Sequence, residues 1–283
     1  MMPRLTRSGL MLRIGGSKSH GEVALDISGL EAARENLTRS YGEDGYVALE
    51  GFFGPDAMRT INAEVERFIA ERVPSLPREQ VYLENKDDPT SIKQLQKLHE
   101  HDPFFRSLME EGPVRRLAEI VLDGPVSCRN MQFFNKPAGV GQPTPPHQDG
   151  YYFHLQPCLA ATAWLALEPV DEETGCIHYV RGSHKAAGFR PHSRTGTLGF
   201  SQGISDFGTA QDKANDVGFP AQPGTLLIHD ARTIHWAGGN RSPTRSRKAL
   251  GFIFYSERAT FDEASWAAYQ ARLAAELASA GKI

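Results

Sequence analysis

Hydrophobic positions in the first 125 residues recur mostly at the three-to-four-residue spacing of a helix. This spacing predicts helices over 28–38, 54–72 and 102–122, the last with a break at Gly112-Pro113. Between the first two, the stretch YVALEGF at 46–52 alternates apolar and polar residues as a strand does. The N-terminal part is therefore expected to be mainly helical, with one strand.

From Val126 onward the pattern changes to short segments rich in aromatic and β-branched residues, with glycine between them. These predicted strands are VSCRNMQFFN, ATAWLALEPV, CIHYVRG, GTLLIHD and KALGFIFYS. After Thr260 the helical period returns and continues to residue 278. The chain is thus expected to be mainly β, an antiparallel barrel or sandwich flanked by helices.

Composition narrows the class of partner. The 283 residues are 40% hydrophobic, enough for a sizeable core, and we expect one domain over 1–283. A net charge of −3 predicts no nucleic-acid partner, and no apolar run reaches the roughly 18 residues of a membrane span. A small molecule is the expected partner. The three cysteines form no CxxC pair, which indicates a reducing compartment and a cytoplasmic setting.

The first twenty residues carry four basic side chains and no acidic one. Organellar targeting segments often have this composition. We favour a loosely ordered basic terminus around a short strand, GLMLRIG, because such composition is common by chance.

The stretch TPPHQDGYYF places His147 and Asp149 two residues apart. In an extended segment such residues point to one face, about 6.6 Å apart, and can converge on one ion. A third ligand must come from elsewhere, and LLIHDARTIHWAGGN offers His229 and His235. We choose His235, which lies past the apolar strand and beside Gly238-Gly239. Two histidines and one carboxylate suit non-haem Fe(II) and dioxygen.

Four blocks of sequence support this interpretation. They are FFNKPAG, HQDGYYF, WLALEPVDEETGCIHYVRGSHK, and HWAGGNRS followed by RKAL. In their order and spacing they resemble the phytanoyl-CoA dioxygenase family of Fe(II)- and 2-oxoglutarate-dependent oxygenases, from about residue 46 to 256. The resemblance implies a double-stranded β-helix, or jelly-roll, core of the cupin type. It also implies that His147, Asp149 and His235 hold the iron.

The same resemblance assigns Arg247, which opens KALGFIFYS, to the distal carboxylate of 2-oxoglutarate. Arg241 and Arg245 are the alternatives for this role, and we interpret both as solvated turn residues. The chain departs from the family after the distal histidine, where Trp236-Ala237 replaces a common Gly-Ser pair and one extra residue precedes the arginine. This departure calls the serine hydrogen bond to 2-oxoglutarate into question. Losing one such bond typically costs about 1 kcal/mol, which should weaken cosubstrate binding without abolishing it.

Other 2-oxoglutarate contacts implied by the family are Trp164 and Gln132, although Trp164 is also explained as a core aromatic. Lys93 is a further candidate, but Lys97 competes with it, and an exposed helix face would explain both lysines.

Tyr151 and Tyr152, directly after the metal pair, are predicted to form the wall of the substrate pocket. Phe153 fits the same wall or plain core packing. His184 is interpreted as structural. The remaining histidines have no informative partner spacing: His99, His101, His154, His178 and His192.

Residues 186–217 are polar and rich in glycine, and a connection of this length is typical of an active-site lid. In this segment Arg190, His192 and Arg194 could receive an anionic substrate, such as the phosphates of coenzyme A. The family resemblance does not fix that substrate, because its members also act on small polar metabolites.

The implied reaction couples decarboxylation of 2-oxoglutarate to succinate and CO₂ with hydroxylation of an unactivated C–H bond by O₂. Two other classes remain open. A cupin-like metal-binding protein would use the barrel without oxidation but would not need Arg247, and a catalytically silent binding module would not need the intact ligand set.

Overall fold

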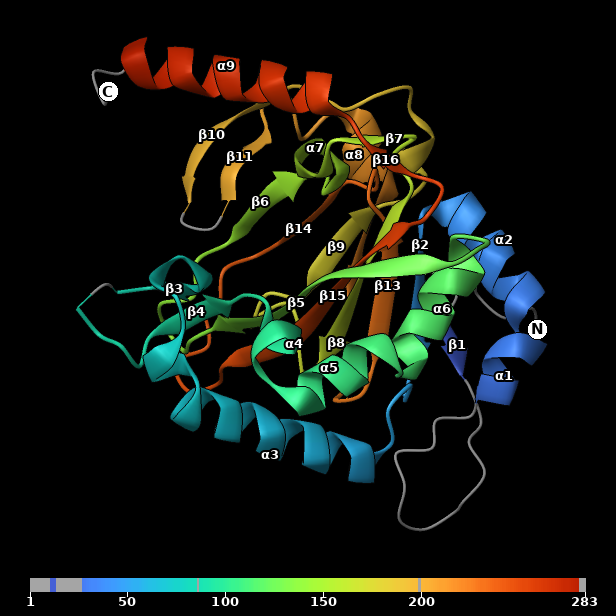
Figure 1. The fold of residues 1–283 in the computed structure, drawn as a ribbon, viewed down its shortest axis with the longest axis vertical. Coiled ribbons are helices and arrows are strands. Elements are labelled where there is room, and N and C mark those ends of the chain that lie inside the picture. The colour runs from blue at the N-terminus through green and yellow to red at the C-terminus, as the bar shows by residue number, and fades with distance from the viewer. Residues whose placement is uncertain (1–10, 14–26, 86, 198–199, 280–283) are drawn as a thin grey trace, which may run out of the picture.

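The computed structural model describes residues 11–13, 27–85, 87–197 and 200–279, and its architecture is a two-sheet sandwich with helices outside (Figure 1). The helices are α1 (Ile27–Ala32), α2 (Arg34–Asp44), α3 (Pro55–Glu71), α4 (Leu98–His101), α5 (Pro103–Glu110), α6 (Pro113–Val121), α7 (Gly150–Phe153), α8 (Ala210–Asn215) and α9 (Glu263–Ser279), with 3-10 turns at Val73–Ser75, Arg78–Gln80 and Ser183–Lys185.

The larger sheet has the strand order β1-β2-β13-β8-β15-β5-β4-β3. These strands are β1 (Met11–Arg13), β2 (Tyr46–Glu50), β13 (Leu226–Asp230), β8 (Ala160–Ala166), β15 (Arg247–Ser256), β5 (Val126–Lys136), β4 (Ile92–Leu95) and β3 (Val81–Leu83). All its neighbouring pairs are antiparallel except β1 with β2.

The smaller sheet has the order β12-β9-β14-β6, and two separate strand pairs complete the described β structure. Its strands are β12 (Asp216–Phe219), β9 (Ile177–Val180), β14 (His235–Ala237) and β6 (Thr144–His147). The pairs are β10 (His192–Thr197) with β11 (Phe200–Ile204), and β7 (Leu155–Gln156) with β16 (Thr260–Phe261). Strands distant in sequence alternate within both sheets, which is jelly-roll topology, so the expected mainly-β fold is confirmed.

Alternating residues of the large sheet separate two cores. Ala163 and Leu165 of β8 pack with the helices α2, α3, α5 and α6 on the outer face. Trp164 and Ala166 of the same strand pack inward against β9 and β12 of the small sheet. Because side chains alternate across a strand, each strand of this sheet offers every second residue to the space between the sheets.

Most elements expected from the sequence are found within a few residues. Proline opens α3, α5 and α6, where the missing N–H leaves no hydrogen bond unmade. Asp102 caps α5 by accepting a hydrogen bond of 3.0 Å from the backbone N–H of Phe104. The first helix differs: it is divided into α1 and α2, and α2 continues to Asp44.

Two interpretations are wrong in detail. Lys93 does not lie on an exposed helix face, since it belongs to β4 and is 9% exposed. The long connection expected over 186–217 is not simply a loop, because it contains the β10–β11 hairpin and α8, whose N-terminus carries a capping box between Thr209 and Asp212. Of the basic terminus, only Met11–Arg13 is described, as strand β1 beside β2.

Candidate active site

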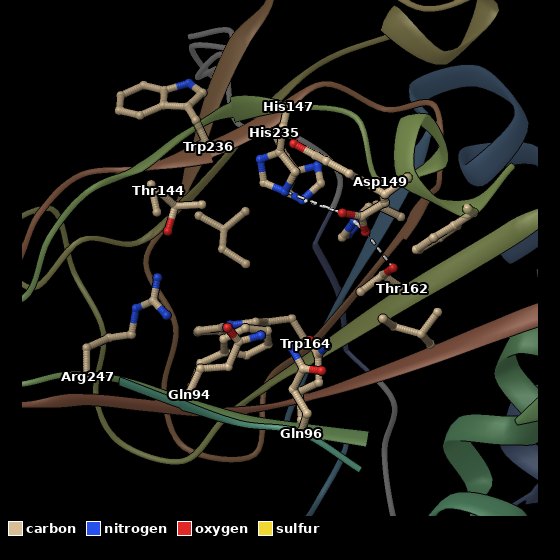
Figure 2. Close-up of a pocket in the computed structure, with 18 residues that line it drawn as sticks. Gln94, Gln96, Thr144, His147, Asp149, Thr162, Trp164, His235, Trp236 and Arg247 are labelled. Carbon is tan, nitrogen blue, oxygen red and sulfur yellow. Dashed lines mark hydrogen bonds and ion pairs between the residues drawn. The ribbon is translucent and has the colours of Figure 1, made fainter. Parts of the chain in front are cut away.

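Three side chains with metal-ligating atoms meet where β6 and β14 pair. His147 is the last residue of β6, His235 is the first of β14, and the two face each other across the antiparallel strands. Their ring centroids are 4.1 Å apart. Asp149 completes the group (Figure 2). The structure therefore brings together the three residues that the sequence predicted as ligands.

The ligand atoms of these residues converge on one point. The Nε2 atoms of His147 and His235 lie 3.3 and 3.6 Å from Oδ1 of Asp149. The expected strand geometry is wrong in one respect, because β6 ends at His147 and Asp149 already has a helical backbone, with φ −57° and ψ −39°. A hydrogen bond of 2.7 Å from the N–H of Gly150 to the carbonyl of Ala231 holds this turn.

Backbone carbonyls fix the tautomer of both imidazoles. Nδ1 of His147 lies 2.8 Å from the carbonyl oxygen of Pro145, and Nδ1 of His235 lies 3.0 Å from that of Thr233. A carbonyl only accepts, so each Nδ1 carries the proton and each Nε2 presents its lone pair to Asp149. Burial also holds the pKa of His235 well below its usual value. Two lone pairs facing a carboxylate oxygen repel one another unless a cation lies between them, so the donor set fits a divalent metal ion.

The second oxygen of Asp149 is held from the opposite side. Oδ2 accepts a hydrogen bond of 2.6 Å from the hydroxyl of Thr162 and lies 3.2 Å from Nε2 of His229. The hydroxyl of Tyr179 lies 3.0 Å from Nδ1 of that histidine. His229, the alternative third ligand, thus orients the carboxylate rather than joining the group formed with His235.

A cavity of about 260 Å³ opens between the sheets beside these residues (Figure 2). His147 and Asp149 lie at one side of it, while Trp164 and Arg247 of the large sheet lie across from them. Its lining residues are Gln94, Gln96, Gln132, Phe134, Thr144, His147, Asp149, Tyr152, Phe153, Thr162, Trp164, Ile177, His229, His235, Trp236, Ala237, Arg247 and Ile253.

Arg247 is a buried cation without a carboxylate partner in the described part of the chain. It is 4% exposed, and its Nε and Nη2 donate to the carbonyl of Gly175 at 3.1 and 3.0 Å. The guanidinium carbon lies 5.2 Å from the ring centroid of Trp164. Burial lowers the pKa of Arg247 to about 10, so it remains protonated at neutral pH. A cation held this way is placed to receive an anion in the cavity.

The rival arginines have other contacts. Arg245 pairs with the carboxylates of Asp171 and Glu173 at the surface, and Arg241 donates to the carbonyl of Glu172. Neither lines the cavity, whereas Arg247 does.

The other predicted contacts divide into two groups. Trp164, Gln132 and Tyr152 line the cavity. Lys93 does not: its ammonium group lies 3.8 Å from the carboxylate of Glu84. Tyr151 also lies outside the lining and stacks on His192, with ring centroids 3.9 Å apart.

Of the two predicted substrate arginines, Arg190 is not among the described residues that line the cavity. Arg190 forms ion pairs of 2.9 and 2.7 Å with Asp206 and Asp212, so its charge is balanced within its own segment. The side chain of Arg194 lies outside the described residues.

Sequence reasoning missed four polar residues of the lining: Gln94, Gln96, Thr144 and Thr162. The alternation of IKQLQ, with Leu95 buried between two glutamines, was the signal that could have found the first pair. Treating these residues as a helix hid it.

The family of the chain follows from its similarity to known proteins. The family model for phytanoyl-CoA dioxygenase (PhyH) matches residues 41–249. The chain belongs to the phytanoyl-CoA dioxygenase family. It is 29% identical over 175 residues to phytanoyl-CoA dioxygenase domain-containing protein 1 of Danio rerio, covering 60% of this chain and 59% of that protein. It is 27% identical over 231 residues to the peroxisomal phytanoyl-CoA dioxygenase of Mus musculus, covering 76% and 66%.

The chain thus spans slightly less than two thirds of these two relatives. Among solved structures, the non-haem alpha-ketoglutarate-dependent epimerase SnoN from nogalamycin biosynthesis is similar with a TM-score of 0.65 and 25% identity, covering 82% of this chain and 86% of that one. The family and fold expected from the sequence are confirmed, and the expected enzyme class and cofactors agree with them.

Proposed function

We propose that this protein is an Fe(II)- and 2-oxoglutarate-dependent dioxygenase that hydroxylates an unactivated C–H bond of a small molecule. The reaction would consume O₂ and convert 2-oxoglutarate to succinate and CO₂. One observation carries the proposal: a cavity with two imidazoles and a carboxylate converging at one side, and with a buried arginine lacking a carboxylate partner among the described residues at the other.

His147, Asp149 and His235 would hold the iron, which supplies the redox chemistry when bound. The chain's own part is orientation. Thr162 and His229 hold the second oxygen of Asp149, so that the first faces both imidazoles. The two backbone carbonyls described above keep the proton away from each Nε2. These contacts would preserve the ligand geometry before the metal arrives.

The cosubstrate would place its distal carboxylate against Arg247, with Trp164 beside it. The family commonly supplies a serine hydroxyl at the position that Ala237 has on β14, so this hydroxyl is absent here. Thr144 lies directly opposite Ala237 on β6, and both line the cavity. We assign the missing hydrogen bond to the Thr144 hydroxyl.

The remaining lining supports a neutral substrate with polar groups. Tyr152, Phe153 and Ile253 supply apolar surface, and Gln96 supplies an amide. Arg247 is the single lysine or arginine among the described lining residues, and the distal carboxylate of the cosubstrate would neutralise its charge. A phosphate-bearing acyl-CoA would need further cations, so we favour a small neutral molecule over the anionic substrate suggested by Arg190 and Arg194.

The 186–217 segment remains our candidate for a cover. Gln202 of β11 accepts a hydrogen bond of 2.9 Å on its side chain from the Tyr151 hydroxyl, and its backbone carbonyl accepts one from Tyr152. The hairpin is thereby tied to α7, which starts directly after Asp149. Movement of the hairpin would thus reach the metal side of the cavity.

Anaerobic addition of Fe(II) and 2-oxoglutarate to the purified protein tests this function. We expect the weak visible charge-transfer band of the chelate, and O₂ should then release succinate, faster when a substrate is present. A cupin-like binding protein would take up metal without the band. A silent module would show neither the band nor succinate, and either result would overturn the proposal.

We also propose a cytoplasmic location. Its support is that Cys128, Cys158 and Cys176 form no disulfide, as expected in a reducing compartment. None of the described helices combines the length and apolar character needed to cross a membrane.

A further inference from the structure

A second group of ligand-type side chains lies at the start of β9, apart from the cavity. Cys176 directly precedes this strand, His178 is its second residue, and Glu172 lies in the preceding turn. The Nε2 of His178 is 3.7 Å from Sγ of Cys176 and 3.2 Å from a carboxylate oxygen of Glu172. One ligand atom of each residue lies within 4.8 Å of the others.

These separations match those around a tetrahedral zinc-type ion. Zinc lies about 2.3 Å from a thiolate sulfur and about 2.0 Å from an imidazole nitrogen or carboxylate oxygen. At the tetrahedral angle, such bonds put sulfur and nitrogen about 3.5 Å apart and nitrogen and oxygen about 3.3 Å apart. The two distances at His178 Nε2 thus differ from these values by a few tenths of an ångström at most, and the sulfur and the carboxylate oxygen, within 4.8 Å of each other, would approach one another as the ion binds.

His178 is already oriented for this role. Its Nδ1 lies 3.0 Å from Oδ2 of Asp216, whose Oδ1 accepts a hydrogen bond of 2.8 Å from the indole N–H of Trp236. The Trp236 ring stacks on the imidazole with centroids 4.1 Å apart. A carboxylate on one imidazole nitrogen fixes the tautomer and directs the other nitrogen to a metal.

Gly218 keeps the space beside the group open. It pairs with His178 across β12 and β9. A Cβ at this position would lie 2.7 Å from Oε1 of Glu172 and 2.9 Å from Cε1 of His178. Any side chain here would push the glutamate away from the imidazole.

Burial gives the group one open side. Cys176 is fully buried, and the His178 side chain is 12% exposed, whereas the Glu172 side chain is 62% exposed. A fourth ligand could therefore come from solvent on the Glu172 side. A buried thiolate selects a borderline-soft ion such as Zn²⁺ over Mg²⁺ or Ca²⁺.

We propose that Cys176, His178 and Glu172 bind a zinc-class divalent ion with water as the fourth ligand, at a site separate from His147, Asp149 and His235. Asp216 is the positioning residue of this site. Without the ion, the same contacts would be held by a proton on His178, shared between Asp216 and Glu172. The two descriptions differ in whether the Cys176 thiol releases its proton to solvent and binds the metal through its sulfur.

Cobalt titration of the metal-free protein separates them, because a Co²⁺–thiolate bond gives an intense near-ultraviolet band that imidazole and carboxylate ligands do not. We expect two Co²⁺ per wild-type chain and the thiolate band. Cys176→Ser should lose the band and bind one Co²⁺, with affinity for the second weakened at least tenfold. His147→Ala should bind one Co²⁺ and keep the band, so failure of the iron centre and failure of this site are distinguishable.

Two further variants complete the test. Asp216→Asn should keep the band but weaken this Co²⁺ about 10- to 100-fold, as loss of such an orienting carboxylate does elsewhere. Cys128→Ser, a half-buried thiol on β5, is the matched control and should behave as wild type. Absence of a thiolate band from the wild type, or its persistence in Cys176→Ser, would overturn the proposal. Far-ultraviolet circular dichroism checks that each variant is folded.

Discussion

Replacing Arg247 with alanine tests the proposed cosubstrate site most directly. The guanidinium is 4% exposed and is held by the carbonyl of Gly175 and the ring of Trp164. Gly175 has φ +85°, and a Cβ there would lie 2.3 Å from the carbonyl oxygen of Gly238, so this position requires glycine. Arg247 is not one of the proposed metal ligands, so the iron affinity of the variant should stay close to that of the wild type.

The magnitude follows from burial and charge. Two unit charges about 4 Å apart interact by about 4 kcal/mol at the effective dielectric of about 20 that suits protein sites. Removing one partner of a buried charge pair typically costs 2 kcal/mol or more. We therefore expect Arg247→Ala to weaken 2-oxoglutarate binding by about 2 to 4 kcal/mol, which is about 30- to 1000-fold in the dissociation constant.

The assay is an anaerobic titration of the Fe(II) protein with 2-oxoglutarate, followed by the visible band, with bound iron measured separately. Arg245→Ala is the matched control. Its side chain is 41% exposed and pairs with Asp171 and Glu173, and surface pairs contribute about 0–1 kcal/mol, so its cosubstrate affinity should change less than about fivefold. A wild-type dissociation constant in Arg247→Ala, or an equal loss in Arg245→Ala, would refute the assignment.

Three further outcomes are expected. His147→Ala should lower bound iron from one per chain to nearly none while circular dichroism stays unchanged; full occupancy would remove this residue from the ligand set. Thr144→Val should weaken 2-oxoglutarate about three- to tenfold, since one hydrogen bond contributes about 1 kcal/mol, and isothermal calorimetry on Thr144→Ser should show recovery. Arg190→Ala leaves the buried Asp212 without its ion pair and should speed limited proteolysis within 186–217, with cosubstrate affinity preserved; unchanged cleavage would mean that the pair does not order the segment.

The sequence was sufficient to predict which residues form the candidate metal centre, but it did not predict their geometry correctly. Spacing alone left His229 and His235 as rivals, because it does not specify cross-strand register. The structure pairs His235 with His147 and turns His229 toward the other oxygen of Asp149. The strand assumed for Asp149 ends two residues too early, and a helical turn supplies the convergence instead.

Residues whose environment depends on distant segments were the hardest to predict. Gln94 and Gln96 enter the cavity only because β4 joins the edge of the large sheet beside β5. Arg190 looked available for a substrate because its two carboxylate partners lie 16 and 22 residues further along the chain. Long amphipathic helices such as α3 were predictable, since their own periodicity determines which face is buried.

The two faces of the large sheet carry different sets of residues: one set packs against the helices and stabilises the fold, and the other lines the cavity and determines which ligand fits. Leu165 is sealed beneath the helices, and truncating such a side chain costs roughly 2 to 5 kcal/mol, while its neighbour Trp164 borders the cavity. On β15, Phe252 and Ile253 divide in the same way. Natural selection can therefore alter every second residue of these strands to accept a new molecule, while the residues between them continue to hold the sheet against its helices.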